Sequence, residues 1–135
     1  MKLILAIIQP EELPDIKDEL IKRKIYKFTV SAAKGQGKEI PVTEVYRGIS
    51  HELSLLSKVR LEIAVNDEFV DSVVEAITTV AKKDGVKGRG KIFIFPLEEC
   101  IRIRTGETGA EAIGWYKIIN NNIILYSESI SRFNS

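Results

Sequence analysis

Several residue types are rare in the sequence, and each scarcity argues against a particular structural feature or function. Among 135 residues there is one cysteine, Cys100, so an internal disulfide is excluded and a reducing compartment is favoured. The single histidine, His51, is expected to lie exposed in a loop rather than to act in catalysis. The net charge is only +1, which argues against nucleic-acid binding, because proteins that bind nucleic acids normally carry a strongly basic surface.

Long hydrophobic runs are also missing. The apolar start, residues 2–8, is too short to span a membrane, and no small-residue cleavage site follows it, so neither a membrane span nor a signal peptide is expected. The chain is nevertheless 44% hydrophobic, which is enough for a core that needs no metal or disulfide. Its length fits one domain, and we expect a soluble, cytoplasmic protein.

Hydrophobic periodicity predicts four strands. Residues 2–8 form a continuous apolar run, as in a strand buried on both faces. Residues 58–65 alternate between polar and apolar, which predicts a strand with one buried face. Weaker alternation predicts strands at 25–34 and 91–95. The run C-I-R-I-R-T, residues 100–105, alternates as well and is interpreted as a last extended piece.

Helical periodicity predicts two amphipathic helices. The first spans about residues 12–24, with Pro14 in its first turn, where the missing N–H costs nothing. The second begins after a cap at Asn66 or Asp67 and ends near residue 83, with Gly85 suited to the position just beyond it. The order strand, helix, strand, strand, helix, strand is typical of the α+β, ferredoxin-like βαββαβ sandwich, with both helices on one face of an antiparallel sheet.

The fold leaves two questions that the pattern alone does not answer. The second sheet face needs a ligand, a partner or another subunit to cover it. The interval between the second and third strands, residues 35–57, is also much longer than an ordinary turn. We interpret it as a protruding loop of the kind that carries function.

The stretch D-G-V-K-G-R-G-K, residues 84–91, has two interpretations. Its glycines let backbone N–H groups approach an anion and its cations would complete a phosphate site, but it could equally be a helix C-cap, a turn and solvated side chains. The pair Arg102 and Arg104, expected on one side of an extended segment, suits phosphate or carboxylate, or is simply a solvated face. The run G-Q-G-K, residues 35–38, is a third weak phosphate signal.

Other functions find less support in the residues. The run R-G-K-I-F-I-F, residues 89–95, partly resembles an RNA-recognition strand motif, but it falls on the fourth predicted strand instead of the third. Cys100 has no nearby histidine to activate it, so it is not expected to be a nucleophile. We therefore expect neither an enzyme nor an RNA-binding protein.

Several blocks taken together resemble the PII signal-transduction family, the nitrogen-regulatory proteins. They run from residue 1 to about residue 113 with almost no gaps in spacing, and the last block is the most specific. The blocks are K-L-I-L-A-I-I-Q-P, F-T-V, G-Q-G-K, T-E-V-Y-R-G, K-V-R-L-E-I-A-V, G-R-G-K-I-F-I-F-P-L-E-E and I-R-I-R-T-G-E-T-G-A-E-A-I.

The resemblance implies a homotrimer of ferredoxin-like subunits that binds ATP or ADP between neighbouring subunits. The domain would span residues 1–113, with an effector-binding T-loop at about 37–55 and a C-terminal extension at 114–135. The glycine-rich basic turn would be the B-loop and the arginine pair would lie in the C-loop. The B-loop and T-loop base of one subunit would meet the C-loop of the next, so that D-G-V-K-G-R-G-K becomes a phosphate cradle completed in trans.

The resemblance also assigns residues by position. The expected nucleotide-binding residues are Ile7, Thr29, Gly35, Gly37, Lys38, Glu62, Ala64, Gly88, Arg89, Gly90, Lys91, Arg102 and Arg104. Lys58 would reach 2-oxoglutarate, a ligand that joins through Mg²⁺ bound by the ATP phosphates and a T-loop glutamine. The expected effector-binding residues of the T-loop are Tyr46, Arg47, Gly48, Ser50 and His51, and Arg47 matches a residue that enters ammonium transporter pores in some members.

Departures from the family pattern concentrate in the loops. The glutamine position holds Glu39, which could bind Mg²⁺ but would repel the dicarboxylate 2-oxoglutarate. The usual G-D-G-K is G-R-G-K here, so Arg89 replaces an acid beside the phosphates. His51 stands where many members carry a uridylylated tyrosine, so that modification is not expected. Ile49 stands where cyanobacterial members carry a phosphorylated serine, and Ser50, one place away, is the weaker alternative acceptor.

The resemblance thus predicts a non-enzymatic adenylate sensor that controls an ammonium transporter or a nitrogen-metabolism enzyme. The alternative is a divergent PII-like sensor of another small ligand, such as AMP or bicarbonate, without a 2-oxoglutarate response; Glu39 favours it. The pattern I-I-N-N-N-I-I-L-Y, residues 118–126, predicts a hairpin or an extra strand in the C-terminal extension, with a disordered tail as the alternative.

Overall fold

The computed structural model describes residues 1–36, 55–83, 90–119 and 122–126, and the surroundings of side chains as far as residue 114 apart from Lys83. Pro10–Glu12 and Asp67–Phe69 are short 3-10 turns that lead into the two long helices. The named elements are β1 (Lys2–Ile8), α1 (Leu13–Lys22), β2 (Thr29–Gly35), β3 (Leu56–Val65), α2 (Val70–Lys83), β4 (Lys91–Pro96), α3 (Gly109–Ile113), β5 (Trp115–Ile119) and β6 (Asn122–Tyr126).

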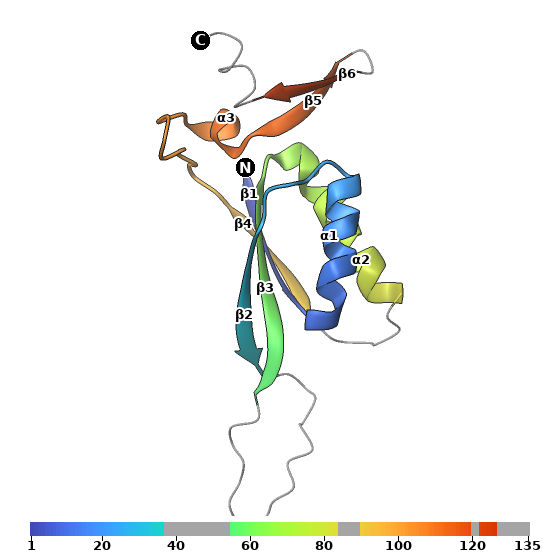
Figure 1. The fold of residues 1–135 in the computed structure, drawn as a ribbon. Helices are drawn as coiled ribbons and strands as arrows, with labels where there is room; N and C mark the ends of the chain where they lie inside the picture. The colour runs from blue at the N-terminus through green and yellow to red at the C-terminus, as the bar shows by residue number, and fades with distance from the viewer. Residues whose placement is uncertain (37–54, 84–89, 120–121, 127–135) are drawn as a thin grey trace, which may run out of the picture.

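The first six long elements confirm the predicted α+β, ferredoxin-like arrangement. Four strands form one antiparallel sheet in the order β2-β3-β1-β4, and both long helices lie on one face of it (Figure 1). Two strand–helix–strand crossovers, β1-α1-β2 and β3-α2-β4, therefore run over the same face of the sheet. No helix in the described part of the chain has the length and apolar character needed to cross a lipid bilayer.

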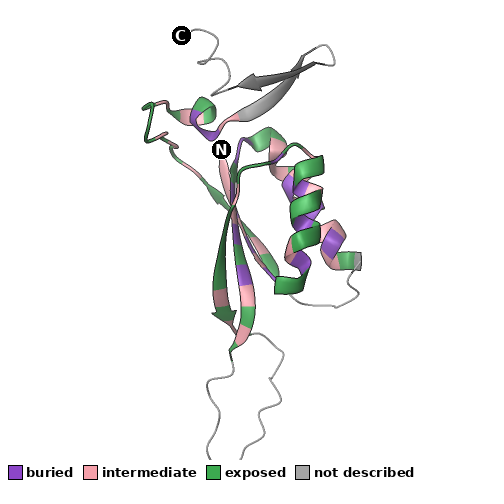
Figure 2. Ribbon diagram, viewed as in Figure 1, coloured by how far each residue is buried: buried purple, intermediate pink, exposed green. Residues whose placement is uncertain are grey.

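The core fills the space between the sheet and the two helices, as the purple residues in Figure 2 show. The alternation of residues in β3 determines which of them face the core. Val59, Leu61 and Ile63 are all buried and lie opposite the buried residues of β1. The prediction that β1 is buried on both faces is wrong for the single chain. Ile4 and Ala6 are fully buried, but the alternate residues of β1 are only half-buried, because none of the described elements covers the second face.

Both helices have slightly different bounds from those predicted. α1 ends at Lys22, before the predicted residue 24, because Lys24 adopts a left-handed φ of 65° that reverses the chain. Pro14 does lie in the first turn. In α2 the apolar stripe buries Val73, Ile77 and also Ala76, a small residue that the sequence pattern did not single out.

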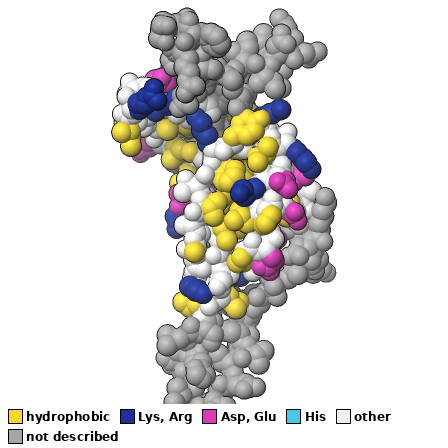
Figure 3. Space-filling model, in the orientation of Figure 1, with side chains coloured by type: hydrophobic (Ala, Val, Ile, Leu, Met, Phe, Trp, Pro, Cys, Tyr) yellow, Lys and Arg dark blue, Asp and Glu magenta, His cyan; other side chains and the backbone are white. Residues whose placement is uncertain are grey.

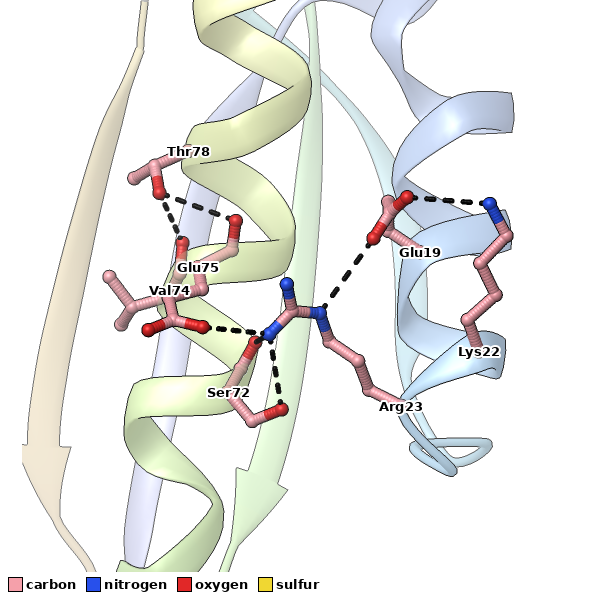
Figure 4. Close-up of polar contacts among 7 residues, drawn as sticks. All are labelled: Glu19, Lys22, Arg23, Ser72, Val74, Glu75 and Thr78. Atoms are coloured by element: carbon pink, nitrogen blue, oxygen red, sulfur yellow. Dashed lines mark hydrogen bonds and ion pairs between the residues drawn. The ribbon is translucent and has the colours of Figure 1, made fainter.

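Arg23 ties the two long helices together at their outer edge (Figure 4). Its guanidinium Nη1 donates to Glu75 Oε2 at 3.0 Å and to the carbonyl oxygen of Ser72 at 3.4 Å. Its Nε lies 3.7 Å from Glu19 Oε2 on α1. Because Glu75 is largely exposed, the ion pair by itself contributes little to stability.

The N-terminus is held at the start of the α2 segment. The Met1 ammonium donates to Asp67 Oδ1 at 2.9 Å, and Lys2 Nζ lies 3.6 Å from the same oxygen. The hydrogen bond from the ammonium group, followed by the charge of Lys2, lowers the pKa of Asp67 below its usual 3.8. Asp67 therefore keeps its negative charge at the N-terminal end of the helix.

Two sequence-based boundaries near the ends of the sheet are wrong. β2 begins at Thr29, not at residue 25, because Ile25 is buried in the core as part of the turn that follows α1. The segment 100–105 is not a strand. Only one isolated bridge, Ile101 with Thr108, forms there, and residues 103–105 are a turn.

The predicted C-terminal hairpin is present. β5 and β6 form an antiparallel two-stranded sheet separate from the main sheet, with Trp115 opposite Tyr126 and Ile119 opposite Asn122. α3, which precedes the hairpin, was not predicted. Its first residue, Gly109, has a φ of 67° that reverses the chain direction after Thr108.

Candidate functional site

The sheet face away from the helices carries most of the described residues that the resemblance assigned to ligand binding. Strand registers place alternate residues of each strand on this open face. Its central part is apolar, with Leu3, Leu5 and Ile7 of β1 beside Phe93 and Phe95 of β4. Both phenylalanines remain more than 40% exposed in the single chain, at 43% and 46%. A surface of this kind normally marks an interaction site.

Gly90 is pressed against β1 in a way that only glycine permits. Its φ is +111°, a region that residues with side chains rarely adopt. A Cβ there would lie closer than 3.0 Å to the carbonyl oxygen of Ile7, which is backbone and cannot move aside. The next residue, Lys91, pairs with Ile7 in the sheet. The structure thus brings Ile7, Gly90 and Lys91 together at one end of the open face.

A second group of assigned residues lies on the neighbouring strands. Thr29 of β2 pairs directly with Glu62 of β3, and Ala64 follows two residues along the same strand. Glu62 accepts a hydrogen bond from Arg60 Nε at 2.6 Å. Arg60 of β3 pairs with Ile7 of β1, so it links the group around Gly90 to the group around Glu62. Sequence reasoning did not select Arg60, although its place in the alternation of residues 58–65 would have put it on the same face.

Gly35 and Lys58 form the lower edge of the site, where β2 and β3 enter the long loop. The alkyl stem of Lys58 packs over Gly35, and a Cβ on Gly35 would lie 3.4 Å from Lys58 Cγ. Lys58 is half-buried and projects from the open face. A lysine with its stem covered and its ammonium near a loop is well placed to bind a carboxylate or phosphate.

Arg102 and Arg104 do not lie on one side of a strand, contrary to the prediction. They belong to the C-loop, residues 97–108, in which Gly106 N–H donates to the carbonyl oxygen of Arg102 at 2.8 Å and closes a turn. Arg102 Nη2 also donates to the carbonyl oxygen of Ala112 at 3.3 Å. Arg104 is exposed. The alternation of isoleucine and arginine suggested a strand, but too little backbone lies alongside to pair with it.

Within one chain, the C-loop is far from Gly90 and Lys91. β4 begins at Lys91 opposite Ile7, and Leu97 N–H donates to the carbonyl oxygen of Met1 at the other end of β1. The two ends of β1 are separated by about 20 Å, at about 3.3 Å per residue. The C-loop and the start of β4 accordingly lie at opposite ends of the sheet (Figure 1). The structure therefore brings together the open-face residues but not the two arginines.

Ten of the predicted site residues cannot be placed, because they lie outside the described residues. They are Gly37, Lys38, Glu39, Tyr46, Arg47, Gly48, Ser50, His51, Gly88 and Arg89. Among the residues that are described, no group of acidic, histidine and cysteine side chains could hold a metal ion. The predicted Mg²⁺ ligand, Glu39, belongs to the part that is not described, so that prediction stays a prediction.

The hollow between α1 and α2 is chemically unsuited to phosphate. It is lined mainly by carboxylates, and acidic side chains gather on this side of the molecule (Figure 3). The C-loop, by contrast, projects at the upper left of the same view and carries basic and hydrophobic side chains. The residues that line the hollow are Glu11, Glu12, Asp15, Asp18, Glu19, Lys22 and Val80.

Two further features of the site were not predicted. Gln9 directly follows β1 and is buried, and its side-chain Nε2 has no hydrogen-bond partner in the described structure. Ile101 and Ile103 flank Arg102 and are highly exposed, at 62% and 101%. Their apolar character was visible in the sequence, but strand alternation would have placed them on a buried face. In the observed loop they form an uncovered apolar edge beside the arginines.

Comparison with known proteins gives the same family from a family model and from individual relatives. The family model described as nitrogen regulatory protein P-II matches residues 1–107. Nitrogen regulatory protein GlnK1 of Methanosarcina mazei is 50% identical over 114 residues, which is 84% of this chain and 97% of that protein. Nitrogen regulatory protein P-II 2 of Methanothermobacter thermautotrophicus is 45% identical, over 84% of this chain and 97% of its own length. Nitrogen regulatory protein P-II of Rhizobium etli is 44% identical, over 84% of this chain and all of its own.

Proposed function

Because the chain belongs to the nitrogen regulatory protein P-II family, we propose that it is a signalling protein that binds ATP or ADP between the subunits of a homotrimer. The observation that carries this proposal is the contact between Gly90 and the carbonyl oxygen of Ile7. Because residue 90 has no side chain, the backbone directly before Lys91 stays open to a ligand. A phosphate group can approach such a backbone closely, and Lys91 supplies the countercharge.

The separation of the assigned residues favours a site shared by two subunits. Arg104 cannot reach a phosphate bound at Gly90 of its own chain, because the two lie at opposite ends of the sheet. In a closed ring of identical subunits, the C-loop of one copy can lie against the start of β4 in the next. The exposed Ile101 and Ile103 would then become buried against that neighbour.

The open sheet face supplies a surface for this assembly. Its apolar centre, around Leu5 and Phe93, is too large to stay in water without cost, and a second and third copy would cover it. The family relationship supports the same arrangement. The homologues are named as regulatory proteins, which supports a regulator rather than an enzyme. The proposed output is a nucleotide-dependent contact between the T-loop and a target protein. An ammonium transporter or a nitrogen-metabolism enzyme is the expected target.

Exchange of subunits tests whether the site is shared. Lys91→Ala and Arg104→Ala should each bind ADP at least 100-fold more weakly than the unmodified protein, because each removes one side of the phosphate site. When the two variants are refolded together in equal amounts, about one quarter of the sites should combine an intact Lys91 with an intact Arg104 from the neighbour. Calorimetric titration with ADP should then recover about one quarter of the binding stoichiometry.

The matched control mixes Lys91→Ala with the double variant Lys91→Ala/Arg104→Ala. No intact site can form in this mixture, so no binding should return. If the first mixture recovers nothing while both variants remain trimeric, the two residues do not complete each other's site and the shared-site proposal fails.

Glu39 favours a second candidate function, in which the protein senses adenylates, or AMP or bicarbonate, and responds only weakly to 2-oxoglutarate. The half-buried Lys58 keeps a cation available for a carboxylate, but a carboxylate at residue 39 would oppose a second one beside the Mg²⁺ and phosphates. We expect 2-oxoglutarate to change the ATP affinity of this protein by less than about twofold. In Glu39→Gln the repulsion is gone, and 2-oxoglutarate should raise the ATP affinity at least about tenfold.

Isothermal titration with ATP and Mg²⁺, with and without 2-oxoglutarate, checks this prediction. Glu39→Asp is the matched control, because it keeps the negative charge and should stay unresponsive. Strong synergy in the unmodified protein would contradict the prediction and would identify a 2-oxoglutarate sensor despite Glu39.

A further inference from the structure

Glu99 closes the C-loop with a single side chain. Its carboxylate oxygen Oε1 accepts a hydrogen bond from Cys100 N–H at 2.9 Å and a second from Gly109 N–H at 2.8 Å. Hydrogen bonds to an ionised acceptor are stronger than those between neutral groups. Both donors are backbone N–H groups, which any residue except proline supplies. One carboxylate therefore holds together the two stretches of backbone that enter and leave the loop.

Inside this closure the backbone of the C-loop bonds to itself. Arg102 N–H donates to the carbonyl oxygen of Glu107 at 2.9 Å, and Gly106 N–H donates to the carbonyl oxygen of Arg102 at 2.8 Å. Residues 103–105 form the turn at the tip, and Arg104 is exposed there. The place of Arg104 is thus set by a short ladder of hydrogen bonds whose base Glu99 closes.

The base of the C-loop is also attached to the body of the subunit. Leu97 N–H donates to the carbonyl oxygen of Met1 at 3.1 Å, just before the closure. The buried Asn66 donates from Nδ2 to the carbonyl oxygen of Ala110 at 3.4 Å, just after it. These bonds fix the entering and leaving segments on the subunit, and Glu99 fixes the two segments to each other.

We propose that Glu99 is a positioning residue for the nucleotide site, which holds the C-loop closed so that Arg104 is presented to phosphates at Gly90 and Lys91 of the neighbouring copy. This inference rests on the shared site proposed above. A guanidinium group pairs best with phosphate in a fixed, two-pronged orientation. A loop that is ordered before binding loses little conformational freedom when the ligand arrives, and this raises affinity. Glu99 acts through Arg104 and does not itself contact the phosphates.

Substitution of Glu99 tests its effect on binding. Glu99→Ala should remain trimeric but bind ADP about tenfold more weakly, because the loop must then be ordered at each binding event. Glu99→Gln should stay within about threefold of the unmodified protein, because an amide oxygen can still accept both N–H groups. Glu98→Ala is the matched control and should bind ADP normally, since Glu98 is an exposed carboxylate of the same loop that takes no part in the two bonds.

Calorimetric titration with ADP measures the affinities, and sedimentation velocity measures the assembly. Unweakened binding by Glu99→Ala would overturn the proposal. Binding by Glu99→Gln as weak as that by Glu99→Ala would overturn it too, because the charge of Glu99 and not its closure of the loop would then matter.

Refolding in pairs shows on which side of the site Glu99 acts. Glu99→Ala mixed with Lys91→Ala should recover about one quarter of the ADP sites at unmodified affinity, each with Lys91 from the first chain and the C-loop from the second. Glu99→Ala mixed with Arg104→Ala should recover none, because every C-loop in that mixture is altered. If the first mixture recovers none while Lys91→Ala and Arg104→Ala do complement each other, Glu99 does not act through the C-loop and the inference is wrong.

Hydrogen exchange tests the closure without any nucleotide. The amides of Cys100 and Gly109 should exchange at least about tenfold faster in Glu99→Ala than in the unmodified protein, because the ends of the loop can then open. In Glu98→Ala they should exchange at the unmodified rate. Equal exchange in all three proteins would refute closure by Glu99 whether or not ADP binds. Absence of ADP binding by the unmodified protein would instead count against the proposed function, so the two failures are distinguishable.

Discussion

Gly90→Ala should abolish ADP binding, with an affinity at least 100-fold below that of the unmodified protein. The new Cβ would lie closer than 3.0 Å to the carbonyl oxygen of Ile7, and the backbone φ of +111° is one that alanine rarely adopts. The start of β4 must therefore move away from β1. We expect the free energy of unfolding to fall by about 2–4 kcal/mol, as for other substitutions that strain a special backbone position.

Calorimetry with ADP and urea denaturation measure the two effects separately. Gly109→Ala is the matched control, because its φ of 67° is also positive but no atom lies within 4 Å of the added Cβ. It should cost only about 1 kcal/mol of stability and leave ADP affinity within about threefold. If Gly90→Ala binds ADP as tightly as the unmodified protein, the backbone before Lys91 does not hold phosphate, and the observation that carries the proposed function is lost.

Phe93→Asp should dissociate the assembly and, with it, remove nucleotide binding. Phe93 lies on the open face opposite Leu5 and is 43% exposed in the single chain. In a symmetric trimer the substitution would bring three carboxylates into a desolvated interface, where each is strongly unfavourable. The subunit itself should still fold, because the side chain points away from the core between sheet and helices. Sedimentation velocity should show a monomer at micromolar concentration, and ADP titration should show no binding.

Ile94→Asp is a matched control for this prediction. Ile94 is the next residue of the same strand, has a similar exposure of 47%, and lies on the helix side of the sheet. It should remain trimeric and bind ADP within a fewfold of the unmodified protein. A trimeric Phe93→Asp would show that the open face is not the interface. A monomeric Phe93→Asp that still binds ADP would show that one chain suffices for the site.

The two substitutions therefore separate site from assembly. Gly90→Ala is expected to lose binding while remaining associated, since it displaces the start of β4 but keeps the apolar side chains of Leu5 and Phe93. Phe93→Asp is expected to lose association first and binding as a consequence. If both variants lose both properties, circular dichroism of each decides whether the subunit has unfolded.

Much of the fold followed from local patterns in the sequence. Alternation across residues 58–65 correctly identified the buried face of β3, because a strand half covered by helices requires a period of two. Helical periodicity correctly predicted that the first helix is amphipathic, and its buried stripe in the structure is Ile16 and Leu20. The order of the elements then left few topologies, and the observed sheet order is one of them. The family, too, was correctly identified from blocks of sequence.

Tertiary contacts decided what those patterns could not. Ile101 to Arg104 alternate like a strand, but strand formation needs a pairing partner. Among the described residues Thr108 alone provides one, so the segment turns instead. Sequence alone marked Gly90 as part of a phosphate loop or a plain turn. Only its contact with Ile7, 83 residues away in the chain, explains why no side chain is tolerated there. The distance between Arg104 and Lys91 is likewise a property of the folded sheet, since residues separated by one strand must lie at its opposite ends.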